Sequence, residues 1–139
     1  MSNAIWLFLA LPNWYISTIA DPLGAGPLTA IPAFGTICLF IGITVGLIQR
    51  AWELKWFFLP AIASQLFVAV AGALRGELFD ESSQPALLSF IVFQIILAGY
   101  LIYRVGEARL AAVALAIFSV TYALFAAFIA GMSFNDTWL

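Results

Sequence analysis

The sequence predicts an all-α integral membrane protein: a bundle of four transmembrane helices with an N-terminal interfacial or re-entrant segment. Of the 139 residues, 65% are hydrophobic and only 9% are charged, whereas a soluble domain carries about 25% charged residues. Four apolar runs also reach the length of about 18 residues that reads as a membrane span. So few charges could not cover a soluble globule of this size, and we therefore expect a bilayer around the chain.

The composition also limits which kinds of binding site the protein can contain. The charge is nearly balanced, with 5 basic and 7 acidic residues, so the dense basic patch that a nucleic-acid partner requires is missing. Histidine, the commonest metal ligand, does not occur. The single cysteine, Cys38, excludes an internal disulfide and a cysteine-based metal site. We expect no cofactor and no metal, while a bound lipid or quinone is compatible with the chain.

The N-terminal region, residues 1–31, is expected to be an aromatic segment followed by a Pro/Gly loop. Residues 4–20 are apolar, but Pro12 removes a backbone donor in their middle and Asn13 follows it. Trp6 and Trp14 belong to the residue types that gather at membrane–water interfaces. We expect a helix lying in the interface or a short re-entrant pair, with a fifth membrane span as the alternative.

The four-helix transmembrane bundle is expected in residues 32–139. Proline is well suited to a first helical turn, and acidic residues are favourable just before it. Pro32 and Pro85 open two of the runs, and acidic residues precede Pro85. The expected helices cover about 32–49, 56–74, 85–103 and 109–131.

Basic residues in the loops predict the orientation of the bundle. Arg50 and Lys55 flank the first turn, and Arg104 and Arg109 flank the third, so four of the five basic residues lie on one side. By the positive-inside rule that side is cytoplasmic. We therefore expect an N-out/C-out topology, in a bacterial inner (plasma) membrane.

Small residues predict where the helices pack. Because lipid tails are as apolar as leucine, membrane helices associate through close packing of small residues and interhelical hydrogen bonds. Residues 32–49 contain Gly42 and Gly46, four positions apart, with Gly35 two turns earlier. Residues 109–131 contain a small-residue stripe with alternating spacings of four and three, which consists of Ala112, Ala116, Ser119, Ala123, Ala126 and Ala130. We expect both faces to lie against other helices, and against each other in one arrangement.

Polar residues within the spans predict a layer near the middle of the bilayer. Gln65 and Gln94 are about equally far from the loop near residues 79–80, so a rise of about 1.5 Å per residue brings them to a similar depth. The candidate polar binding layer consists of Gln65, Gln94, Ser119, Thr121 and Tyr122. Its side chains can form interhelical hydrogen bonds, bind a small polar solute or a quinone-like headgroup, or contact another subunit.

Charged residues near the second loop supply two weaker candidates. Arg75 either snorkels to the interface or contacts an anionic headgroup. Glu77, Asp80 and Glu81 form either a solvated acidic loop or a divalent-cation site.

The interiors of the spans carry no Asp, Glu, Lys or Arg, and proton-coupled transport generally depends on such groups. No nucleophile–base pair appears either, so we expect no enzymatic activity. The sequence favours a non-catalytic small subunit of a larger membrane complex, whose partners are membrane lipids and other subunits or further copies of itself. The alternative is a small oligomeric channel or transporter for a neutral or weakly polar solute that passes through the polar layer.

Overall fold

The computed structural model describes residues 3–20, 29–74, 80–106 and 108–134. Every regular element in these ranges is helical: α1 (Asn3–Ala20), α2 (Ala30–Ile48), the 3-10 helix η2 (Trp52–Phe57), α3 (Phe58–Ala73), α4 (Asp80–Arg104) and α5 (Arg109–Phe134). This confirms the all-α prediction. Four stretches are long and apolar enough to cross a membrane, namely α2, η2 with α3, most of α4, and α5.

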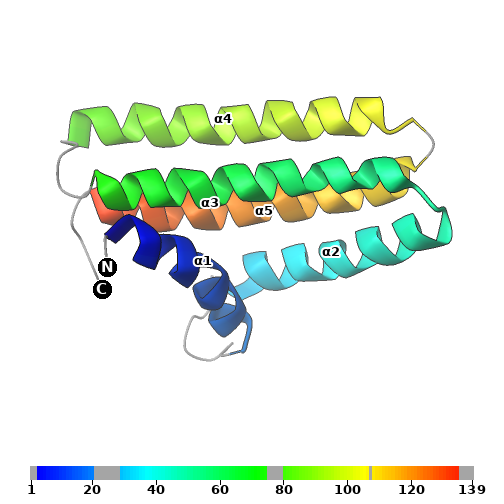
Figure 1. Cartoon of the computed structure of the whole chain (residues 1–139), viewed down its shortest axis with the longest axis horizontal. Coiled ribbons are helices and arrows are strands. Elements are labelled where there is room, and N and C mark those ends of the chain that lie inside the picture. Colours follow the sequence, from blue (N-terminus) through cyan, green and yellow to red (C-terminus); the bar gives the residue numbers. More distant parts are fainter. Residues whose placement is uncertain (1–2, 21–28, 75–79, 107, 135–139) are drawn as a thin grey trace.

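Helix α5 is the centre of the bundle. Helices α2, α3 and α4 each pack extensively against it, and α1 lies against α3 beside it (Figure 1). In the most apolar 18-residue stretch of α5, 56% of the residues are buried, whereas 22–33% are buried in the corresponding stretches of the other three candidate spans. Its many alanines explain this position, because small side chains allow neighbouring backbones to approach from several sides.

The small-residue stripe is buried along its whole length: Ala112 0%, Ala116 5%, Ser119 1%, Ala123 2%, Ala126 0% and Ala130 0% exposed. Its members share buried clusters with side chains of α3 and α4, such as Val68 and Phe90. Gly35 and Gly42 of α2 meet a different side of α5, and Gly46 meets Leu54 of η2. A Cβ on Gly42 would lie 2.6 Å from Cγ of Leu115, and one on Gly35 would collide with Thr121. The two small faces therefore both pack on helices but do not pack on each other.

Two helix starts differ from the expected ones. The expected helix 56–74 is a 3-10 turn followed by α3, and α4 begins at Asp80, five residues before Pro85. An acidic residue at a helix start interacts favourably with the positive end of the helix dipole. The acidic stretch that we expected to be a loop therefore extends α4 by about 7 Å.

The N-terminal segment forms one helix, α1, that continues through Pro12. The re-entrant pair is therefore not formed, while the depth of α1 in a membrane stays a prediction. Leu7 and Leu11 are at most 1% exposed and share a buried cluster with residues of α3 and α5. Helix α2 begins beside the middle of α5, because Gly35 lies against Thr121. Helices α1 and α2 thus lie one after the other along the bundle (Figure 1).

The phenylalanines of α5 show which part of the surface of α5 is covered by α1. The sequence favours lipid or a partner protein as the neighbour of Phe118, Phe125 and Phe128. In the structure Phe118 and Phe125 pack edge-on against Tyr15 of α1, with ring centroids 6.3 and 5.5 Å away. Phe128 remains 49% exposed. The helix that we expected to lie apart in the interface thus covers part of this aromatic face.

Candidate functional site

The polar layer is divided into two groups of side chains on different sides of α3. The first group joins α3 to α4. Gln94 is 1% exposed, and its Nε2 lies 3.2 Å from the carbonyl oxygen of Pro60 and 3.3 Å from Oγ of Ser64, to both of which it donates. Ser64 itself donates to the same Pro60 carbonyl at 2.9 Å. These three residues form a buried polar contact between the two helices.

The second group joins α1, α3 and α5. Nε2 of Gln65 donates to the hydroxyl of Tyr122 at 2.7 Å. The ring of Tyr122 meets that of Tyr15 at 5.1 Å between centroids, and the Tyr15 hydroxyl donates to the carbonyl of Pro32 at 2.9 Å. One chain of contacts therefore runs from α3 through α5 and α1 to the start of α2. We call this group the tyrosine cluster: Tyr15, Pro32, Gln65 and Tyr122.

The two remaining members of the expected layer satisfy their hydroxyls within α5. Ser119 donates to the Leu115 carbonyl and Thr121 donates to the Phe118 carbonyl, both at 2.8 Å. Such bonds to the preceding turn are ordinary for hydroxyls in helices. The five candidates therefore do not converge on one point.

A double-mutant cycle on Gln65 and Tyr122 tests the bond within the tyrosine cluster. We expect Gln65→Leu and Tyr122→Phe each to lower the stability of the purified protein. The coupling energy should be about 0.6 kcal/mol, and at most about 1.7 kcal/mol, the range measured for hydrogen bonds between membrane helices. Equilibrium unfolding in mixed micelles measures it. Additive effects of the two changes would mean that this bond does not stabilise the bundle.

Two amide oxygens in the layer, Oε1 of Gln65 and Oε1 of Gln94, are buried and accept no hydrogen bond within the described part of the chain. Both side chains are thus anchored through Nε2 alone. A buried acceptor without a partner is unfavourable. Each oxygen therefore has the capacity to accept one more donor.

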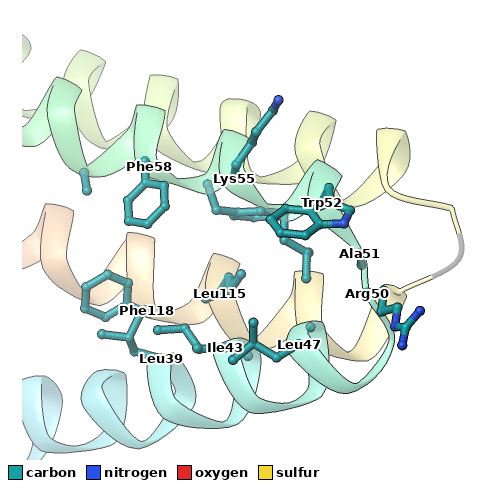
Figure 2. A pocket seen from close by; sticks show the side chains of 15 residues that line it. Leu39, Ile43, Leu47, Arg50, Ala51, Trp52, Lys55, Phe58, Leu115 and Phe118 are labelled. Carbon is teal, nitrogen blue, oxygen red and sulfur yellow. The ribbon is translucent and has the colours of Figure 1, made fainter.

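An apolar concavity lies between α2, η2 with α3, and α5, and no member of the polar layer lines it (Figure 2). Its volume is about 340 Å³, within the range of small-molecule pockets. Leu39, Ile43 and Leu47 line it from α2, and Phe58 and Leu115 face them from the other two helices (Figure 2). We call this concavity the α2–α3 cleft.

The α2–α3 cleft ends at the turn that follows α2. Arg50 and Lys55 line this end together with Trp52, whose side chain is 81% exposed. Arg50 has a φ of 52°, in the left-handed region that ordinary residues seldom adopt. The turn is closed by a hydrogen bond from the Ala51 amide to the Gly46 carbonyl at 3.0 Å. An apolar cleft thus opens at a basic turn.

Sequence reasoning missed several residues that matter here. Tyr15, like Trp14, is an aromatic residue of the type that gathers at membrane interfaces, and nothing in the sequence distinguishes the two. Ser64 stands four residues after Pro60, a spacing that allows the observed side-chain bond and could have indicated it. No pattern in the sequence indicated the cleft. Arg75 and Glu77 lie outside the described residues, and so do the side chains of Asp80 and Glu81.

The described geometry therefore offers three features for a functional interpretation. These are the pair of polar groups around α3, the α2–α3 cleft with its basic end, and the exposed apolar surface of the outer helices. Comparison of the chain with protein-family models, with curated proteins and with solved structures gives no match.

Proposed function

We propose that the chain is a non-catalytic small integral-membrane subunit of a larger membrane protein complex. The outer face of α4 is the observation that carries this proposal. Helix α4 packs on α5 with Ala98 and Leu101, which are at most 4% exposed. The opposite side of the helix has no covering element among the described residues (Figure 1).

The outer face of α4 is a continuous stripe. At about 100° per residue, its members fall within about 60° of Ile96 on either side: Ser89, Val92, Phe93, Ile96, Gly99, Tyr100 and Tyr103. The four large residues Phe93, Ile96, Tyr100 and Tyr103 are spaced 3, 4 and 3 positions apart and are each more than half exposed. This spacing is that of a helix seam that packs against another helix.

The composition of this stripe favours a protein neighbour over lipid alone. A Cβ on Gly99 would meet nothing within 4 Å, so the chain's own packing does not require glycine there. Glycine lowers helix propensity by about 1 kcal/mol relative to alanine. Small residues and hydroxyls in membrane helices allow close approach and hydrogen bonding to a neighbouring helix. Gly99 would allow the close approach, and the hydroxyls of Ser89, Tyr100 and Tyr103 would supply the hydrogen bonding.

The proposal includes an orientation. Arg50, Lys55, Arg104 and Arg109 stand at the end of the bundle where α2 and α4 end and α5 begins (Figure 1). The positive-inside rule favours the cytoplasm for this end. A bacterial inner membrane is the environment that we propose.

Native mass spectrometry of the particle, extracted gently from its own membrane, tests the proposal. We expect the chain within a particle that contains other polypeptides. Gly99→Leu should weaken that association about tenfold, because an added side chain at a packed contact costs about 1–3 kcal/mol. The stability of the isolated chain should not change, because the new side chain meets none of its own atoms.

Thr44→Leu is the matched control, because Thr44 is exposed on α2, away from the α4 stripe. It should leave the association intact. A particle that contains only one copy of this chain would contradict the proposal. Equal effects of Gly99→Leu and Thr44→Leu would show that the contact does not lie on α4.

One observation supports the alternative of a channel or transporter for a neutral solute. The free acceptors Oε1 of Gln65 and Oε1 of Gln94 could take hydrogen bonds from such a solute. In that case the particle would be a homo-oligomer, and solute flux into vesicles would fall on Gln65→Leu or Gln94→Leu.

A further inference from the structure

The α2–α3 cleft lies in one half of the bundle, and α1 covers α3 in the other half. Helices α2 and α3 both pack on α5. In the half that α1 covers, its Tyr15 reaches Phe118 at 6.3 Å between ring centroids. Phe118 also lines the cleft, so it stands where the half covered by α1 ends and the cleft begins. None of the described side chains of α1 lines the α2–α3 cleft.

The lining determines which chemistry the cleft accepts. Apart from Arg50 and Lys55, all residues that line it are aliphatic, aromatic or glycine. On the α2 side of the cleft, Gly42 and Gly46 contribute no side chains, and a Cβ on Gly46 would collide with Leu54. Such a surface offers hydrogen bonds only at its basic end, so its occupant is apolar along most of its length.

The basic end determines the charge of the occupant. Among the described residues no acidic side chain lines the cleft, and both cations belong to the turn region that follows α2. Figure 2 shows both charged ends beyond the apolar lining, and Nζ of Lys55 lies 5.7 Å from the ring centroid of Trp56. An exposed tryptophan is typical of the headgroup level of a bilayer. A group that is anionic at this level and apolar below it therefore matches the cleft.

We propose that the α2–α3 cleft binds an anionic phospholipid, with one acyl chain along Ile43 and Leu47 and the phosphate beside Arg50 and Lys55. A second copy of this chain is a poorer occupant. Copies inserted with the same orientation bring their own basic ends to the same level, where like charges repel each other. This proposal is independent of the α4 contact, which lies on another helix.

Native mass spectrometry of the full chain in mild detergent measures the binding. We would titrate phosphatidylglycerol and phosphatidylcholine with identical acyl chains and expect tighter binding of phosphatidylglycerol. Arg50→Asn and Lys55→Gln should each weaken it about fivefold, since a basic residue near an anionic surface contributes about 1 kcal/mol. Asparagine is chosen because it tolerates the left-handed backbone. Phosphatidylcholine binding should not change.

Arg109→Gln is the charge-matched control, because Arg109 is exposed at the same end of the bundle but does not line the cleft. It should leave phosphatidylglycerol binding within twofold of wild type, a margin below the about fivefold effect of one local charge. An equal loss in this variant would overturn the proposal, because general attraction to the basic end would then suffice. Equal affinities of the wild-type chain for the two lipids would also overturn it.

The position of the acyl chain is tested with phosphatidylglycerol that carries a photoreactive diazirine midway along one chain. We expect labelling of Leu39, Ile43 and Leu47 in preference to Ile37 and Phe40, which are exposed on α2 but do not line the cleft. Ile43→Trp, a larger side chain at an exposed position, should reduce the labelling of Leu39 and Leu47. Even labelling of both sides of α2, or labelling of a bound polypeptide instead, would overturn the proposal.

Discussion

Replacing Gly42 with leucine should separate α2 from α5 and lower the melting temperature of the protein by about 10 °C, the effect of about 3 kcal/mol. A Cβ at this position would lie 2.6 Å from Leu115 Cγ and 3.2 Å from the Ala111 carbonyl oxygen. Leu115 could change its rotamer, but the Ala111 oxygen belongs to the backbone. The added side chain therefore forces the two helices apart. Thermal unfolding in detergent, followed by circular dichroism, measures the effect.

Gly99→Leu supplies the control for this prediction, because it makes the same change in another membrane helix. A Cβ on Gly99 would meet nothing within 4 Å. Leucine also has a higher helix propensity than glycine. The isolated chain with this change should melt at or above the wild-type temperature. Equal melting temperatures for the Gly42 and Gly99 variants would mean that α2 does not pack on α5 through Gly42.

Tyr15→Ala should release α1 from the bundle. The Tyr15 side chain is 5% exposed, its hydroxyl donates to the Pro32 carbonyl at 2.9 Å, and its ring lies 5.1 Å from that of Tyr122. Loss of a buried aromatic side chain typically costs about 3–5 kcal/mol. The loss would fall on a helix that packs mainly along α3. Hydrogen exchange of the amides in residues 3–20 should therefore accelerate far more than that of α5.

Two further variants separate the ring of Tyr15 from its hydroxyl. Tyr15→Phe keeps the aromatic contacts and should cost only about 1 kcal/mol, the value of one hydrogen bond. Tyr100→Ala removes a tyrosine that is 56% exposed on α4 and should leave exchange in residues 3–20 unchanged. If Tyr15→Phe accelerates exchange as much as Tyr15→Ala, the bond to Pro32 rather than the ring holds α1.

The sequence indicates that Gln65 and Gln94 lie at a similar height along the bundle, but not that they join different groups. Depth follows from the rise per residue, and Gln94 does lie level with the Pro60–Ser64 turn of α3, next to Gln65. The direction of a side chain depends on the rotation of its helix. Ser64 and Gln65 are adjacent, so they point about 100° apart. One therefore meets α4 and the other meets α5.

The same distinction applies to α1. Pro12 and Asn13 weaken the case for a span, and local rules associate Trp6, Trp14 and Tyr15 with an interface. Those rules contain no information about the residues of α3 and α5 that bury Leu7, Leu11 and Tyr15. The burial of these three side chains depends on segments that are far away in the sequence. The α2–α3 cleft escaped prediction for the same reason, since its walls come from residues up to 79 positions apart, Leu39 and Phe118.

The sequence by itself determined the helical class, the four apolar stretches of membrane-spanning length and the small residues along which helices pack. These properties are local, because hydropathy, length and spacing are read within one helix. Only the tertiary structure decided that α5 is the central helix, that α1 packs along α3, and that a cleft with a basic end lies between α2 and α3. These depend on how each helix is rotated against its neighbours, and many rotations bury similar apolar area.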